Sequence, residues 1–285
     1  MTDGNDRFGL YTPDDMLWKV NREVLLILTG ARAVLLEVAH PLIAAGVAQH
    51  SDYRRRPLKR LFRTVRAMQL LSFGTLEEAK QAAKRVHLAH RPVQGALESG
   101  VGPLPEGTPY DARDPQLGLW VFATVIDSIL IGYDLLIRPL SDAEKAAYYE
   151  DSKRMAHLLG VPPKTMPPAF EDFQAYVDRM IHSEVLTVGD LGRDVASGLF
   201  AHPLVGPLAR IGAFCGIGTL PEHLRASFGF HWGDRQERWL DRIGRFSRWL
   251  RPHVPDLVVV HPQAWWKEHS FRSPGGGRRR PHLSG

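Results

Sequence analysis

Apolar side chains recur every three to four residues along most of the chain, which is the spacing of one face of an α-helix. Prolines and capping residues divide this pattern into segments, because proline ends a helix and Ser, Thr or Asp often begins one. The predicted helices cover residues 13–30, 33–40, 42–47, 57–71, 75–90, 114–130, 141–159, 167–180, 188–200, 221–228 and 232–250. The pattern predicts an all-α fold, a single globular bundle of about ten helices that is globin-like in general character.

Two of the predicted helices have distinct apolar patterns. The segment after Asp114-Pro115 is apolar nearly all round, so we expect it at the centre of the fold. The segment 232–250 is amphipathic instead. Its apolar residues at helical spacing are Trp239, Ile243, Phe246 and Leu250, and we expect this face to point inward.

The same pattern assigns residues 13–269 to one domain. Residues 1–12 are polar and are predicted to be a mobile N-terminus, whereas residues 270–285 are rich in Gly, Arg and Pro and are predicted to be a disordered basic tail. Residues 92–114 contain several prolines and glycines, which indicates a long loop of a kind that is often functional. The one strand-like run, Leu257 to Val260, has no evident partner strand.

The formal net charge of +5 is concentrated in two places, residues 54–66 and 278–280. A local excess of this kind favours specific anionic partners over general nucleic-acid binding, and residues 54–66 lack interleaved aromatic side chains that would stack on bases. The single Cys215 excludes an internal disulfide and a cysteine-based zinc site and fits a reducing compartment, so we expect a cytoplasmic protein. No uncharged run reaches the roughly 18 residues of a transmembrane helix. Peripheral membrane contact and the oligomeric state stay open.

The candidate chemistry lies on the two neighbouring helices of residues 57–71 and 75–90. Arg60, Arg63 and Thr64 share one face of the first helix, because they are three and four residues apart. The inner face of the second helix is formed by Ala79, Ala83, Val86 and finally His90. An imidazole for iron, small side chains beside a flat ring and cations for propionates are what a haem pocket requires.

Simpler interpretations of these residues stay open at this point. The helix dipole alone favours a histidine in the last turn, and an arginine-rich helix is most often a solvated surface. Glu37 and His40 have the spacing of one half of a di-iron motif, although a structural hydrogen bond explains them equally well. His87 and His90, three residues apart, are a second possible metal-binding pair.

The order of several short motifs resembles the family that contains bacterial rubber oxygenase (latex-clearing protein) and the mycophenolate-pathway oxygenase MpaB. The segments that carry the resemblance run from about Trp18 to Leu250. They are Leu35-Leu36-Glu37-Val38-Ala39-His40-Pro41, Arg60-Leu61-Phe62-Arg63-Thr64, His90-x-x-Val93-x-Gly95, Tyr110-Asp111-Ala112-Arg113-Asp114-Pro115 and Leu220-Pro221-x-x-Leu224-Arg225. Each motif is short, and the ordered set is specific.

This resemblance implies an all-helical domain that binds haem b and acts as an oxygenase. It implies that His90 is the proximal iron ligand and that Arg60 and Thr64 lie beside the haem. Arg63 stands where rubber oxygenase has a lysine on the distal side, so Arg63 and Thr64 are the candidate catalytic residues and the distal chemistry is expected to differ. The implied substrate is a small hydrophobic molecule, oxidised with dioxygen or peroxide and an electron donor where one is needed. A haem sensor or carrier without turnover is the alternative.

Overall fold

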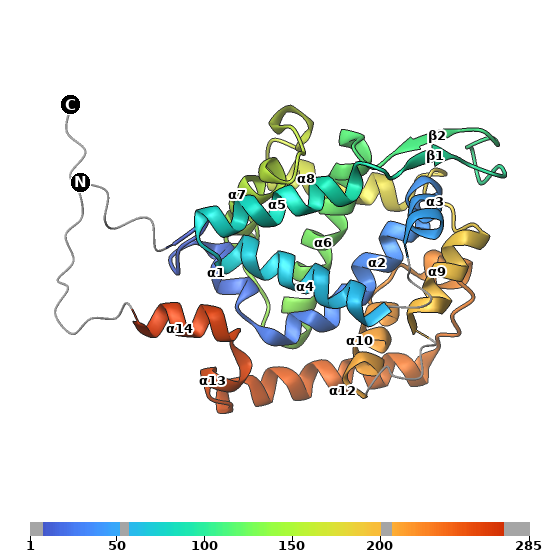
Figure 1. Ribbon diagram of the computed structural model, residues 1–285. Helices are drawn as coiled ribbons and strands as arrows, with labels where there is room; N and C mark the ends of the chain where they lie inside the picture. Colours follow the sequence, from blue (N-terminus) through green and yellow to red (C-terminus); the bar gives the residue numbers. More distant parts are fainter. Residues whose placement is uncertain (1–7, 52–56, 201–206, 271–285) are drawn as a thin grey trace.

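The computed structural model describes residues 8–51, 57–200 and 207–270, and the side chains of residues 57–61, 199–200 and 207–209 lie outside that description. Helices account for nearly all the regular structure, so the predicted all-α fold is confirmed (Figure 1). The helices are α1 (Met16–Asn21), α2 (Gly30–Ala39), α3 (Pro41–His50), α4 (Pro57–Phe73), α5 (Leu76–His90), α6 (Pro115–Leu136), α7 (Asp142–Leu158), α8 (Phe170–Ile181), α9 (Asp190–Phe200), α10 (Pro207–Gly218), α11 (Glu222–Ser227), α12 (Asp234–Leu250), α13 (Asp256–Val259) and α14 (Pro262–Ser270). Three short 3₁₀ helices are η1 (Val24–Thr29), η2 (Pro163–Thr165) and η3 (Arg251–His253).

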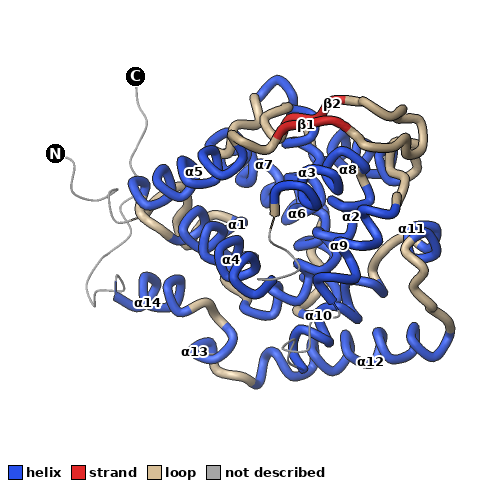
Figure 2. The backbone as a smooth tube through the Cα atoms, turned by 45° about the vertical axis from the view of Figure 1, so that its right-hand side comes forward, coloured by secondary structure: helices blue, strands red, loops and turns tan. Residues whose placement is uncertain are grey.

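Helix α6 is the centre of the molecule, as its apolar sequence predicts (Figure 2). Trp120 is fully buried in it, and the indole Nε1 donates a hydrogen bond of 3.3 Å to the carbonyl of Leu36 on α2. Helices α2, α7, α8 and α12 pack around α6. By length and composition α6 is apolar enough to cross a membrane, as is the bent pair formed by residues 24–39 and 41–50. Because α6 is largely buried by its neighbours, its apolar character is explained by the core.

One fully buried charge fixes α2 against the core. The guanidinium of Arg32 lies 2.6 Å from the carboxylate of Asp127 on α6 and donates hydrogen bonds to the Ser128 hydroxyl and the Thr219 carbonyl. A buried cation without such partners would be strongly destabilising. Arg32 therefore ties three elements together at one point.

The predicted loop of residues 92–114 contains a small antiparallel sheet. Strand β1 (Gln94–Ala96) pairs with β2 (Pro109–Asp111), with Gly95 opposite Tyr110. The sheet covers α3, because Tyr110 is buried against Gly46 and its hydroxyl bonds to the Gln49 side chain. The sequence pattern showed a strand-like run only at Leu257 to Val260 and so did not predict this pair, since three-residue strands are too short to show alternation.

The C-terminal part of the chain packs on the N-terminal part along what we call the N–C seam. The guanidinium of Arg251 donates two hydrogen bonds, 2.6 and 2.7 Å, to the buried carboxylate of Glu23. The indole of Trp18 donates one of 2.7 Å to Glu268 on α14. The predicted strand-like run at Leu257 is the short helix α13 instead, and only Val260 forms a β-bridge, with Glu23.

Residues before the first predicted helix contact the domain. Tyr11 is buried, and its hydroxyl donates a hydrogen bond of 3.0 Å to the carbonyl of Asp151 on α7. Part of the segment predicted to be mobile, residues 8–12, therefore packs on the domain. Residues 1–7 and the predicted tail beyond Ser270 lie outside the described residues.

Helix α12 packs only partly on the face that its sequence suggests, with Ile243 and Leu250 half-buried. Trp239 is 49% exposed and Phe246 is 60% exposed, so the expectation that they point inward was wrong. The packed face carries Leu240 and Gly244 instead, because a Cβ at Gly244 would lie 2.7 Å from the Leu135 side chain and leave no space. Small residues let the helix backbone approach α6 closely, and the large aromatic residues are left outside.

Candidate functional site

Helix α5, which carries His90, begins in a complete capping box. The Thr75 hydroxyl accepts a hydrogen bond from the Glu78 amide, and the Glu78 carboxylate accepts one from the Thr75 amide. The helix ends at His90, since Pro92 disfavours continuation. Its buried residues are Ala79, Ala82 and Ala83, whose small side chains allow close approach of α4.

The predicted site residues lie at one end of the hairpin formed by α4 and α5. At a rise of 1.5 Å per residue, Arg60 and His90 are both about 20–24 Å along their helices from the connection at Gly74. The two helices pack together near that connection and diverge toward the end that carries Arg60 and His90 (Figures 1 and 2). Thr64 lies about one turn closer to the connection.

The side chains at this end are accessible. Arg63 and Thr64 are exposed on α4, and His90 is exposed at the end of α5. The side chain of Arg60 lies outside the described residues. The apolar face that leads to His90 is buried at Ala79 and Ala83 and becomes half-buried at Val86, so the predicted buried stripe opens to solvent at its last turn.

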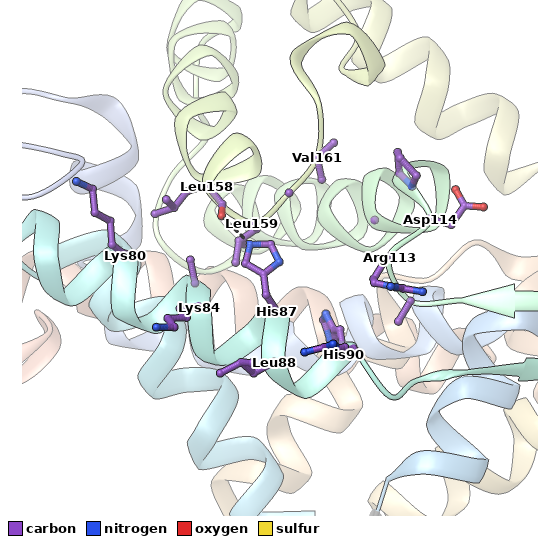
Figure 3. Close-up of a pocket in the computed structure, with 16 residues that line it drawn as sticks. Lys80, Lys84, His87, Leu88, His90, Arg113, Asp114, Leu158, Leu159 and Val161 are labelled. Carbon is purple, nitrogen blue, oxygen red and sulfur yellow. Dashed lines mark hydrogen bonds between the residues drawn. The ribbon is translucent and has the colours of Figure 1, made fainter.

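A pocket with a volume of about 640 Å³ lies beside His90, between α5, the N-terminus of α6 and the end of α7 (Figure 3). Small and branched apolar side chains and four cations line it. They are Ala83, Leu88, Ala112, Gly118, Leu158, Leu159 and Val161 together with Lys80, Lys84, Arg91 and Arg113. A pocket of this size holds a drug-sized molecule, and its lining fits one that is largely apolar and carries an anionic group.

His87 forms part of the wall of this pocket. Its ring points toward the end of α7, where its Nε2 lies 3.2 Å from the carbonyl oxygen of Leu158 (Figure 3). The ring also packs on Gly160, where a Cβ would lie only 2.8 Å from the His87 Cε1. Gly160 has a φ of +92°, which favours glycine on backbone grounds as well. His87 therefore packs against the end of α7.

Two acidic residues, Asp111 and Asp114, lie next to the cation Arg113 of the pocket. Asp114 accepts a hydrogen bond of 2.7 Å from the Gln116 amide and so caps α6. Asp111 pairs with Arg113 at 2.6 Å, and the hydrogen bonds from Arg113 lower the pKa of this carboxyl group. Arg113 is thus held at the rim, and Lys80, Lys84 and Arg91 add positive charge along α5.

His40, which the sequence indicated as a candidate metal ligand, lies at the junction of α2 and α3. It is buried, and its Nδ1 has no hydrogen-bond partner. Burial lowers the pKa of His40 to about 4, and the nearby Asp114 charge opposes this only partly. At neutral pH it is therefore a neutral imidazole with an unused nitrogen. The Glu37-His40 spacing drew attention to this residue, but its burial was not readable from the sequence.

A metal site built from protein side chains alone is not found among residues 8–51, 57–200 and 207–270. No three His, Cys, Asp or Glu residues gather there closely enough to hold an ion. This leaves the di-iron interpretation of Glu37 and His40 without the further carboxylates it requires. A haem, which supplies four ligands itself, needs only one or two residues such as His90.

The sequence was compared with models of known protein families. A model of the family described as "ER-bound oxygenase mpaB/B'/Rubber oxygenase, catalytic domain" matches residues 18–249. The chain belongs to this family. Its fold is therefore that of an oxygenase catalytic domain, and the resemblance seen in the ordered motifs is confirmed.

Two relatives of this oxygenase-family protein are uncharacterized proteins from mycobacteria. They are Mb2261 of Mycobacterium bovis and Rv2237 of Mycobacterium tuberculosis, each 29% identical over 262 residues, with 88% of this chain and 99% of the relative covered. No solved structure matches the chain. The relatives thus extend over nearly the whole domain without adding an assigned activity.

The residues beside His90 fit a haem b. The accessible imidazole of His90 would provide an iron ligand, and Ala83, Gly118 and other small side chains would suit a flat apolar ring. Bound haem would supply a redox-active iron.

Proposed function

We propose that this protein is a haem-b-dependent oxygenase that oxidises a small hydrophobic substrate with dioxygen or peroxide. Membership of an oxygenase family supports the reaction class. The observation that carries the cofactor is the position of His90, which continues the core-facing stripe of α5 and is nevertheless accessible beside a pocket. An accessible imidazole on an apolar face is what ligation of a haem iron requires.

In this proposal His90 binds iron as a neutral imidazole, and Arg60, Arg63 and Thr64 act from α4. Arg60 and Thr64 hold the haem carboxylates through charge-assisted and neutral hydrogen bonds. Arg63 and Thr64, both exposed, are the groups that meet the oxidant or substrate. The guanidinium of Arg63 carries five N–H donors and no acceptor, so in this proposal it orients and neutralises negative charge.

The substrate class follows from the apolar lining of the region. Ala83, Leu158, Leu159 and Val161 supply apolar side chains to the pocket beside His90, and sites of this composition select apolar ligands. The apolar segments around Val34 to Val47 pack in the core instead. We expect the protein to act in the cytoplasm and to take electrons from a separate donor when dioxygen is the oxidant.

His90→Ala provides the test of this proposal. Wild-type protein expressed with added haem should show a Soret band and about one haem per chain, and His90→Ala should lose most of both. His157→Ala, an exposed histidine on α7 outside the pocket, is the matched control and should bind haem like the wild type. Unchanged haem content in His90→Ala would contradict the assignment and direct attention to His40 and His87.

Carbon monoxide separates an oxygenase from a sensor or carrier. The ferrous protein should bind carbon monoxide and shift its Soret band if one iron position is open for oxidant. A six-coordinate ferrous form that ignores carbon monoxide would favour the non-catalytic alternative.

A further inference from the structure

We propose that the outer face of α12 docks on the surface of a lipid bilayer that contains anionic lipids. The face consists of Trp239, Phe246 and Trp249, which we call the α12 stripe, and the arginines between them. This inference concerns a surface outside the candidate site and does not depend on haem binding.

The α12 stripe is an exposed row of large aromatic side chains. Trp239, Phe246 and Trp249 are 49%, 60% and 63% exposed. They are seven and three residues apart, so at about 100° per residue all three lie within a sector of about 80°. That sector faces away from Leu240 and Gly244, the residues that pack on the domain. Exposed aromatic residues that gather in this way mark a binding surface.

Arginines flank the stripe, and acidic residues do not. Arg235, Arg238, Arg242 and Arg245 are exposed and fall in the same outward half of the helix, within a sector of about 120°. The acids of this helix, Asp234, Glu237 and Asp241, lie outside that sector. The guanidinium of Arg242 stands over the Trp239 ring at 5.4 Å. The outward face thus combines aromatic rings with positive charge, which is complementary to an anionic surface.

The remaining arginine of α12 shows the contrast. Arg248 lies on the inner side and donates a hydrogen bond of 2.7 Å to the carbonyl of Leu135. The inward arginine stabilises the fold. The outward arginines are exposed, and among them Arg245 forms an exposed ion pair with Asp241 at 3.0 Å.

The apolar surface continues beyond the end of α12. Trp249 packs on the His253 ring at 5.3 Å, and Leu257 and Val258 of α13 are exposed. Helices α12 and α13 run along one edge of the molecule (Figure 1). An elongated edge of this kind can lie flat on a planar surface.

The chemistry of this edge favours lipid over other partners. Tryptophan rings settle at the headgroup level, and arginine side chains reach lipid phosphates. The aliphatic Leu257 and Val258 insert among acyl chains but cannot stack on nucleic-acid bases. A second copy of the chain would bring the outward arginines against their own copies, which disfavours self-association through this face.

Vesicle flotation tests the proposal. The full-length protein should float with vesicles of phosphatidylcholine containing about one third phosphatidylglycerol and bind pure phosphatidylcholine much less. The double variant Phe246→Ser/Trp249→Ser should bind the anionic vesicles about tenfold more weakly, and Arg235→Gln/Arg242→Gln should lose most of the preference for anionic lipid. Trp266→Ala removes an exposed tryptophan of α14 and is the matched control, with binding unchanged.

Each alternative gives a distinct result. A wild type that floats with neither vesicle, or a double variant that binds as Trp266→Ala does, overturns the proposal. Two further results would also overturn the proposal when the wild type does not bind vesicles. One is a concentration-dependent dimer that the double variant no longer forms, and the other is binding to a single-stranded oligonucleotide that the double variant loses. The replaced side chains are exposed, so circular dichroism and the melting temperature should match the wild type.

Discussion

His40 shows what a single buried group does to the acid stability of this fold. Burial lowers the pKa of its imidazole to about 4, below the value near 6.5 expected in the unfolded chain. Between these two values the unfolded state binds a proton that the folded state excludes. The free energy of unfolding therefore falls as the pH drops from about 6.5 toward 4.

We predict that a buried residue without a titratable ring at position 40 reduces this acid sensitivity. Integrating the pKa difference between pH 7.5 and pH 5 gives a loss of about 2 kcal/mol from His40 in the wild type. Urea unfolding at the two pH values should show that difference shrinking by about this amount in His40→Leu. His157→Leu is the exposed control, and an equal reduction there would refute the role of burial.

Gly160 is the second residue for which we predict an effect on stability. It lies just after α7, in contact with the His87 ring of α5. An alanine there must adopt a φ of +92° and place its Cβ against the His87 ring. We predict that Gly160→Ala lowers the free energy of unfolding by about 2–3 kcal/mol, from strain and steric overlap together. The measurement is denaturant unfolding.

Gly107 is the matched control for this prediction. It also has positive φ, +81°, but a Cβ at that position meets no atom within 4 Å. Gly107→Ala should therefore cost only the backbone term, about 1 kcal/mol. Equal costs in the two variants would show that the His87 contact contributes nothing.

At the scale of the element, the sequence predicted α5 more accurately than α12. In α5 the capping box and the alanines at helical spacing determine both the start and the buried face, and the structure has both. In α12 the apolar residues formed an equally regular pattern, yet only Ile243 and Leu250 of this pattern are half-buried, and Trp239 and Phe246 are exposed. Periodicity alone does not distinguish an inner apolar face from an outer one, and the decisive residue was Gly244.

The candidate site was predictable as a set of residue types but not as a geometry. The motifs indicated His90, Arg63 and Thr64, but α4 and α5 diverge toward these residues, and the lining of the pocket beside His90 does not include Arg63 or Thr64. The pocket beside His90 depends on residues from α6 and from the end of α7 that are distant in sequence. Local pattern carries no information about such long-range neighbours.

At the scale of the whole molecule, the N–C seam contains a buried ion pair between Arg251 and Glu23. Removal of Arg251 leaves the buried carboxylate of Glu23 without its two charge-assisted hydrogen bonds. We predict that Arg251→Ala costs about 3 kcal/mol of unfolding free energy. Arg245→Ala breaks a pair with Asp241 in which both side chains are exposed, and should cost at most about 0.5 kcal/mol. Chemical denaturation of the two variants checks the prediction, and similar losses in both would contradict it.

The N–C seam also sets an order in which the molecule is completed. Trp18 and Glu23 are among the first residues to be synthesised, but Arg251 and Glu268, their hydrogen-bond partners, are made more than 200 residues later. The match to the family ends at residue 249, just before these partners. A nascent chain that has reached only that point holds an unpaired carboxylate at Glu23 and an indole at Trp18 without its acceptor. The N–C seam therefore closes only after residues 251–270 have emerged from the ribosome.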